Sequence, residues 1–88
     1  MKTEQVAEIL LEELAEISRE NGGKPLVNLR LRAEQCGIIA PAFLEEVVAF
    51  MRSKYWIEAP YEAPNGGLYA RVTLQGLRLA HERVMRSI

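Results

Sequence analysis

The chain has 88 residues, of which 49% are hydrophobic and 26% are charged, and its formal net charge is −1. These values are typical of one ordinary globular domain, 1–88, and exclude a disordered chain. The longest apolar run, 37–44, is too short to cross a bilayer, and the first residues lack the basic-then-apolar order of a signal peptide. We therefore expect a cytoplasmic protein with no membrane partner.

The residue types narrow the possible chemistry. Cys36 is the only cysteine, His81 is the only histidine, and there is no aspartate. An internal disulfide, the usual zinc-ligand set and an Asp-supported nucleophile triad are therefore excluded. Glu45 and Glu46 are neighbours about 100° apart on a helix, so they do not converge on one substrate atom. We expect no enzyme and no cofactor.

A helix is predicted over about residues 3–20, with Thr3 as its N-cap and Gly22-Gly23 ending it. Its apolar residues recur at helical spacing over a wide arc: Val6, Ala7, Ile9, Leu10, Leu11, Leu14 and Ile17. Residues 1–20 hold six Glu against Lys2 and Arg19, a balance of −4, whereas 21–88 carry +3. The first helix is thus acidic and the rest of the domain is mildly basic.

The segment 26–36 allows two interpretations. Val27, Leu29 and Leu31 alternate with polar residues, as in an edge strand. Alternatively, Asn28 caps a short helix that contains Leu29, Ala33 and Cys36 and ends at Gly37. We favour a brief extended segment near 26–28, followed by a helix to Cys36, in which the thiol is a buried apolar group.

A third helix is predicted over 41–54, with Pro41 in its first position. Two neighbouring apolar stripes span roughly 160° of this helix and contain Phe43, Leu44, Val47, Val48, Phe50 and Met51. We expect it to be the central packed helix of the domain. The opposite face holds Ala42, Glu45, Glu46, Ala49, Arg52 and Ser53.

A hairpin and a last helix follow. The hairpin arms are expected at roughly 56–60 and 67–72, around a turn-rich loop over 61–67, with Trp56 as a core anchor. Thr73 caps the last helix, and Gly76 weakens its first turn by about 0.5–1 kcal/mol relative to alanine. A heptad-like seam runs along this helix through Leu74, Leu77, His81, Val84 and Ile88.

Three segments resemble the winged helix-turn-helix superfamily. Residues 29–38 are similar to its second helix and turn, and 44–58 to a recognition helix that runs into the first wing strand. Tyr69, Thr73 and Gly76 match the passage from the second wing strand into a final helix. The resemblance implies an α+β winged helix, which has a three-helix core, a two-stranded wing hairpin and a C-terminal helix. Tyr55 stands where these families usually have glycine, and Arg32 where they usually have leucine.

The resemblance also implies a transcription-regulator-like domain with double-stranded DNA as its partner. Phosphate contacts need basic or hydroxyl donors, and the candidates are Lys24, Arg30, Arg32, Arg52, Ser53, Lys54 and Arg71, with the best cluster at Lys24, Arg30 and Arg32. The charge balance argues weakly against this interpretation, because a dedicated nucleic-acid binder usually carries a stronger basic patch. Glu45 and Glu46 also stand where DNA readers tend to have Ser, Thr and Arg.

The second interpretation is a protein-interaction module without specific DNA recognition. Both terminal helices carry more apolar residues than one narrow face needs, so we expect a homodimer formed through Leu10, Leu11, Leu14, Leu77, His81, Val84 and Ile88. On the alternative interpretation, both stripes pack inside a single chain. The two functional interpretations are compatible, because a dimer could also bind DNA.

Overall fold

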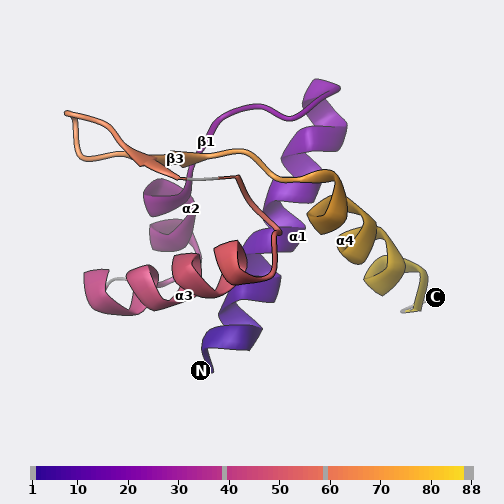
Figure 1. Cartoon of the computed structure of the whole chain (residues 1–88), viewed down its shortest axis with the longest axis horizontal. Helices are drawn as coiled ribbons and strands as arrows, with labels where there is room; N and C mark the ends of the chain where they lie inside the picture. The colour runs from indigo at the N-terminus through magenta and orange to yellow at the C-terminus, as the bar shows by residue number, and fades with distance from the viewer. Residues whose placement is uncertain (1, 39, 59, 87–88) are drawn as a thin grey trace.

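The structure is a computed structural model that describes residues 2–38, 40–58 and 60–86, without the side chain of Val84. The elements in this part of the chain are α1 (Thr3–Asn21), β1 (Val27–Asn28), α2 (Leu29–Gln35), α3 (Pro41–Ser53), β2 (Tyr61–Glu62), β3 (Leu68–Ala70) and α4 (Leu74–Arg86) (Figure 1). The predicted α+β class is confirmed. The predicted boundaries of the helices agree with the structure to within two residues, apart from the C-terminal end of α4, which was not predicted.

A hairpin is present as β2–β3, but the sheet has three strands, so the predicted number of two strands is wrong. The strand order is β1-β3-β2 and both pairings are antiparallel. Val27 pairs with Ala70, and Tyr61 pairs with Tyr69. The extended segment before α2 has backbone groups that need partners, and the free edge of β3 provides them. This pairing joins the start of α2 to the hairpin.

The hairpin loop is shorter than predicted, because Tyr61 and Glu62 belong to β2. The Ala63 amide donates to the Gly67 carbonyl at 2.8 Å, and the Gly66 amide donates to the Ala63 carbonyl at 2.9 Å. Gly66 has a φ of 88°, which favours glycine. The loop therefore closes over 63–67, and the arms reach further than the positions of the prolines suggested.

The central helix is α1, so the prediction that the helix at 41–54 is central is wrong. α1 packs on α2, α3 and α4, and in Figure 1 it runs diagonally upward from the N-terminus with α2 and α3 to its left and α4 to its right. Its wide apolar arc explains this position, because residues on several sides of it are buried: Val6, Ala7, Leu10, Leu11, Leu14 and Ala15. The other helices cover this arc and shield it from water.

The apolar arc of α3 packs on α1, so the predicted burial of this arc is confirmed in its main part. Its buried residues are Leu44, Val47, Val48 and Met51, whereas Phe43 and Phe50 are half-buried. Trp56 is buried just beyond α3 and confirms the prediction of a core anchor. Its ring meets the Phe50 ring edge-on, with 5.5 Å between the centroids. Phe50 and Trp56 thus connect the end of α3 to the base of the hairpin.

The helix caps are partly as predicted. Asn28 accepts from the Leu31 amide at 3.3 Å, and Thr73 accepts from the Gly76 amide at 3.0 Å, so both N-caps are confirmed. The predicted N-cap Thr3 is wrong, because Lys2 caps α1 and Thr3 is its first helical residue. The Gln5 side chain accepts from the Lys2 amide at 3.4 Å, which provides a local partner for this helix end.

Gly76 has a packing role that its low helix propensity did not indicate. A Cβ atom at this position would lie 2.6 Å from the Trp56 carbonyl oxygen and 3.1 Å from Cδ1 of Leu11. Real Cβ atoms essentially never approach a backbone atom so closely. Glycine here lets α4 pack directly on the base of the hairpin and on α1, and this close approach outweighs its poor helix propensity.

Candidate functional site

The outer face of α3 is exposed and acidic in its first half. All six residues predicted for this face are exposed: Ala42, Glu45, Glu46, Ala49, Arg52 and Ser53. Thr3 donates its hydroxyl to Glu46 at 3.4 Å, which places that carboxylate beside the start of α1. A phosphate approaching this half of the helix would meet two carboxylates and two alanines. It would find no side-chain donor among them.

The C-terminal end of α3 carries two exposed cations. Among the described residues, Arg52 makes no side-chain hydrogen bond or ion pair. The Lys54 ammonium lies 5.6 Å from the centroid of the Phe50 ring, a cation–π distance. Ser53 donates its hydroxyl to the Phe50 carbonyl at 2.7 Å, so its proton is already used. This end of α3 holds three adjacent candidates from the sequence analysis.

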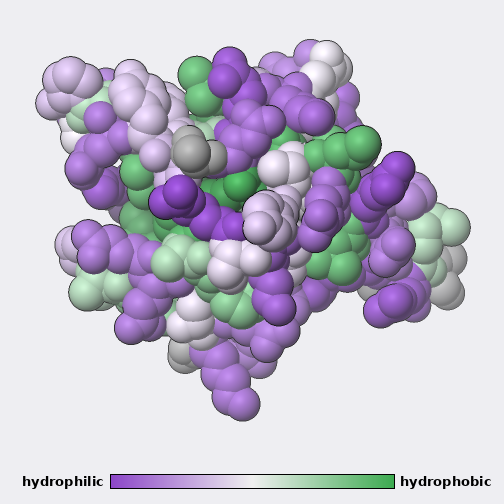
Figure 2. Space-filling model, viewed as in Figure 1, coloured by the Kyte–Doolittle hydropathy of each residue, from purple (hydrophilic) through white to green (hydrophobic). Residues whose placement is uncertain are grey.

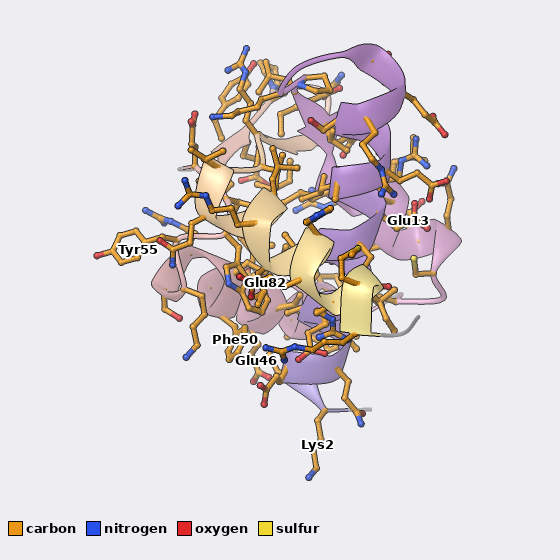
Figure 3. All side chains as sticks on the ribbon, turned by 90° about the vertical axis from the view of Figure 1, so that its right-hand side faces the viewer. Lys2, Glu13, Glu46, Phe50, Tyr55 and Glu82 are labelled. Atoms are coloured by element: carbon orange, nitrogen blue, oxygen red, sulfur yellow. The ribbon has the colours of Figure 1, made fainter. Side chains whose placement is uncertain are left out.

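Tyr55, the next residue, adopts the left-handed conformation with φ of 59°. Its amide donates to the Arg52 carbonyl at 3.0 Å, and the Trp56 amide donates to the Met51 carbonyl at 3.0 Å. This bond pair is the usual way to end a helix at a left-handed residue, normally glycine. Tyr55 therefore adopts the backbone conformation that glycine usually adopts at this position. Its ring projects away from the body of the domain (Figure 3).

The structure separates the basic cluster predicted at Lys24, Arg30 and Arg32. Arg30 donates to the Gly66 carbonyl and lies 3.3 Å from Glu62, so it holds the hairpin loop. Arg32 lies 3.7 Å from Glu13 on α1. Residues two positions apart are rotated by about 200° around the helix axis. The two guanidinium groups accordingly face different elements. Each one has a carboxylate beside it.

Lys24 and Arg71 do lie together. The Arg71 side chain donates from Nε to the Lys24 carbonyl at 3.1 Å, which ties β3 to the segment before β1. Both residues are exposed. Of the seven predicted DNA-binding residues, the structure thus gathers Arg52, Ser53 and Lys54 in one place and Lys24 and Arg71 in another.

The predicted dimer residues fall into three groups. Leu10, Leu11 and Leu14 are at most 2% exposed, so they are used inside the chain, as in the alternative interpretation. Leu77 is half-buried and His81 is exposed. Ile88 and the side chain of Val84 lie outside the described part of the chain. The homodimer stays a prediction, but these three leucines are not surface that a second copy could reach.

α4 packs on α1 along a line that is rotated from the predicted seam. Gly76 and Ala80 are buried, and Arg83 reaches Glu8 and, at 3.3 Å, Glu12. The hydrogen bond to Glu8 raises the pKa of Arg83, and the charge of Glu12 adds to this effect. The ion pairs attach the far end of α4 to α1. The sequence signal for these ion pairs was the placement of Glu8 and Glu12 one turn apart on the acidic first helix.

A groove of about 870 Å³ runs between α1 and α4. Ala15, Leu77 and Ala80 contribute its apolar lining, and Glu16 and Arg86 are among its charged residues. A smaller hollow of about 390 Å³ lies between the start of α1 and the turn from α2 to α3. It is apolar and includes Cys36, whose pKa is raised by burial and by Glu13. The raised pKa favours the protonated thiol, which is less nucleophilic than the thiolate.

The outward face of α4 is a surface that the heptad pattern did not predict. Leu74 is 55% exposed and Met85 is 59% exposed, and the residues exposed between them include Arg78 and Glu82. Neither Arg78 nor Glu82 forms an ion pair with another described residue. Figure 2 shows hydrophobic side chains reaching the surface over α4, and Figure 3 looks onto this helix with Glu82 at the front.

No protein-family model, curated protein or solved structure matches the chain. In residues 2–38, 40–58 and 60–86, no helix combines the length and the apolar character needed to span a bilayer. The same residues contain no group of three or more His, Cys, Asp or Glu side chains arranged to hold a metal ion.

Proposed function

We propose that this chain is a winged-helix domain that works as a protein-interaction module and does not read DNA sequence. The winged-helix assignment is supported by the element order and by the sheet order β1-β3-β2. In this assignment α1, α2 and α3 form the helical core, and the β2–β3 hairpin is the wing. β1 adds a third strand to it.

The observation that carries the proposal is the outward face of α4. One side of this helix packs on α1, while Leu74 and Met85 remain more than half exposed on the other side. Burial of apolar surface contributes roughly 25 cal/mol per Å², so a partner that covers both side chains gains free energy from them. A helix that packs on one side and exposes large apolar side chains near both ends of its outward face can serve as a docking element.

The charges on the winged-helix surface support the same conclusion. In winged-helix DNA complexes, the second helix of the motif lies in the major groove and phosphate contacts supply most of the affinity. The corresponding helix here, α3, exposes Glu45 and Glu46. Arg30 stands 3.3 Å from Glu62, and Arg32 stands 3.7 Å from Glu13. A phosphate placed beside either arginine would also meet a carboxylate.

Fluorescence polarisation with a labelled random duplex at low salt tests the proposal. We expect no saturable binding at protein concentrations up to about 10⁻⁴ M, the weak end of ordinary non-specific affinity. Glu45→Lys with Glu46→Lys is the matched gain-of-binding variant, because it replaces the two carboxylates by donors. Tight binding by the wild-type chain that is lost in Arg52→Ala with Lys54→Ala would contradict the proposal.

A second candidate function, DNA-backbone binding, is supported by one specific observation. Arg52 and Lys54 are exposed side by side at the end of α3, with the Ser53 hydroxyl between them. Two exposed cations at the end of a recognition helix suit phosphate contacts, although the Ser53 hydroxyl between them already donates to the Phe50 carbonyl. For such backbone binding we expect an affinity for DNA that is weak, sensitive to salt and independent of the base sequence, unlike that of a domain that recognises bases.

A further inference from the structure

Four of the seven described exposed residues of α4 lie in one stripe along the helix. At about 100° per residue, Leu74, Arg78, Glu82 and Met85 all lie within about 80° of one another around the helix axis. All four are exposed. These four residues place an apolar side chain at each end and two opposite charges in the middle, and the exposed His81 borders them about 20° to the side of Leu74.

The spacing of this stripe is nearly symmetric about the level of Ala80. Arg78 is two residues before it and Glu82 is two residues after it, while Leu74 and Met85 lie six residues before and five after. In an antiparallel helix pair related by a two-fold axis at this level, residues equally far before and after the axis face each other. Arg78 then faces Glu82 of the partner subunit, and Leu74 lies beside Met85 of the partner subunit.

We propose that the partner of this domain is a second copy of itself, held by an antiparallel pair of α4 helices centred at the level of Ala80. The inference rests on the proposed function and gives its interaction surface a specific occupant. Each Arg78 pairs with Glu82 of the partner subunit, so the pair occurs twice. Each end of the helix pair is closed by a leucine and a methionine.

Charge complementarity selects a second copy over an unrelated partner. Neither Arg78 nor Glu82 is used in an ion pair among the described residues, although they stand four positions apart on one helix. A single stripe that carries both signs at equal distances from a centre is complementary to itself when reversed. The face also lies away from α1, since the packed side of α4 is the one that holds Gly76 and Ala80.

The antiparallel geometry can be tested by exchanging the two charges. Sedimentation equilibrium of the full chain compares the wild type with Arg78→Glu, with Glu82→Arg and with the double variant. Each single variant creates two like-charge contacts and is expected to raise the dimer dissociation constant at least about tenfold. The double variant restores both pairs and is expected to return to the wild-type dissociation constant.

Mixing the two single variants is the sharpest arm of the test. In a mixed pair, the glutamate introduced at position 78 of one chain faces the arginine introduced at position 82 of the other. The unchanged Glu82 of the first chain faces the unchanged Arg78 of the second. An equimolar mixture is therefore expected to dimerise at concentrations where neither variant does so alone.

Controls separate loss of the interface from loss of the fold. Glu34→Arg, an exposed charge reversal on α2, is the matched control and is expected to leave the dissociation constant unchanged. Thermal melts by circular dichroism confirm that each variant is folded.

A wild-type chain that is monomeric at all concentrations overturns the inference. So does a dimer that the single variants do not weaken, or a mixture of the two that remains monomeric. These failures are distinct from failure of the proposed function. A monomer that binds no duplex leaves an interaction module with a different partner, whereas saturable duplex binding by the wild type contradicts the module itself.

Discussion

α3 and α4 are helices of equal length, 13 residues each, that pack on the same helix α1 in different ways. α3 presents Val47 and Met51 to the core and keeps its outward face polar and small. α4 approaches through Gly76 and Ala80 and leaves Leu74 and Met85 outside. Amphipathicity alone therefore does not identify the packed side of a helix. The small residues of α4 permit close contact with the core, whereas Leu74 and Met85 stay exposed on its outward face.

Methionines on the two helices give the largest contrast. Met51 on α3 is 0% exposed, and Met85 on α4 is 59% exposed. Met51→Ala is expected to lower the free energy of unfolding by about 2–5 kcal/mol, because it leaves a cavity in the core. Met85→Ala is expected to change it by less than about 0.5 kcal/mol, and to weaken self-association. Urea denaturation at low protein concentration measures both, and equal losses would contradict the contrast.

Gly76→Ala tests how closely α4 packs. The added Cβ meets the Trp56 carbonyl oxygen, so the substitution is expected to destabilise the fold by about 1–3 kcal/mol. In an exposed helix the same substitution would stabilise by up to about 1 kcal/mol. Urea denaturation gives the sign, and stabilisation would mean that α4 does not lie this close to the hairpin. Glu45→Ala, at an exposed position of α3, is the control.

Tyr55→Gly probes the junction after α3. A tyrosine in the left-handed conformation is unfavourable by about 1–2 kcal/mol, whereas glycine adopts that conformation readily. The variant is expected to be more stable than the wild type by about 1 kcal/mol in thermal or urea unfolding. Ser53→Gly, inside the last turn of α3, is expected to have the opposite sign. If both variants were less stable than the wild type, the exposed Tyr55 ring would have to make a stabilising contact.

The smallest expected effect concerns the protonation and reactivity of the Cys36 thiol. Its pKa is raised by burial first and by Glu13 second, so the folded chain favours the protonated thiol. The resulting small contribution to stability is present below the thiol pKa of the unfolded chain and is lost as the pH rises through the native pKa. Alkylation by iodoacetamide at neutral pH is expected to be slower in the folded chain than in urea. Equal rates would show that the thiol is not shielded at the turn between α2 and α3.

Most of the fold could be predicted from the sequence because its local signals are strong. Asn28, Pro41 and Thr73 stand at helix starts because of their own local conformational and capping preferences, which can be read from the sequence. The apolar residues of α3 also recur at helical spacing. The extended segment near 26–28 was predicted, but its pairing with the hairpin was not, because Val27 pairs with Ala70, a contact between distant positions that no local pattern reports. The central place of α1 depends on which helices cover it, and this is also a property of the whole fold.

The candidate site was harder to predict for physical reasons. Arg30 and Arg32 are close in the sequence, yet helix geometry sends them to the hairpin and to α1. The α4 seam was placed along the heptad positions through Leu77, whereas packing follows Gly76 and Ala80. Small residues carry little weight in a hydrophobic pattern, although they decide where two helices can touch. The outward stripe of α4 follows from that choice.

Sedimentation velocity of the wild-type chain with a labelled random duplex distinguishes a self-associating interaction module from a DNA binder in one experiment. The protein and the label are followed at separate wavelengths over a range of protein concentrations. We expect the protein to shift from monomer to dimer as its concentration rises, while the duplex sediments as it does alone. A chain that stays monomeric and carries the duplex with it would contradict both the proposed function and the proposed dimer.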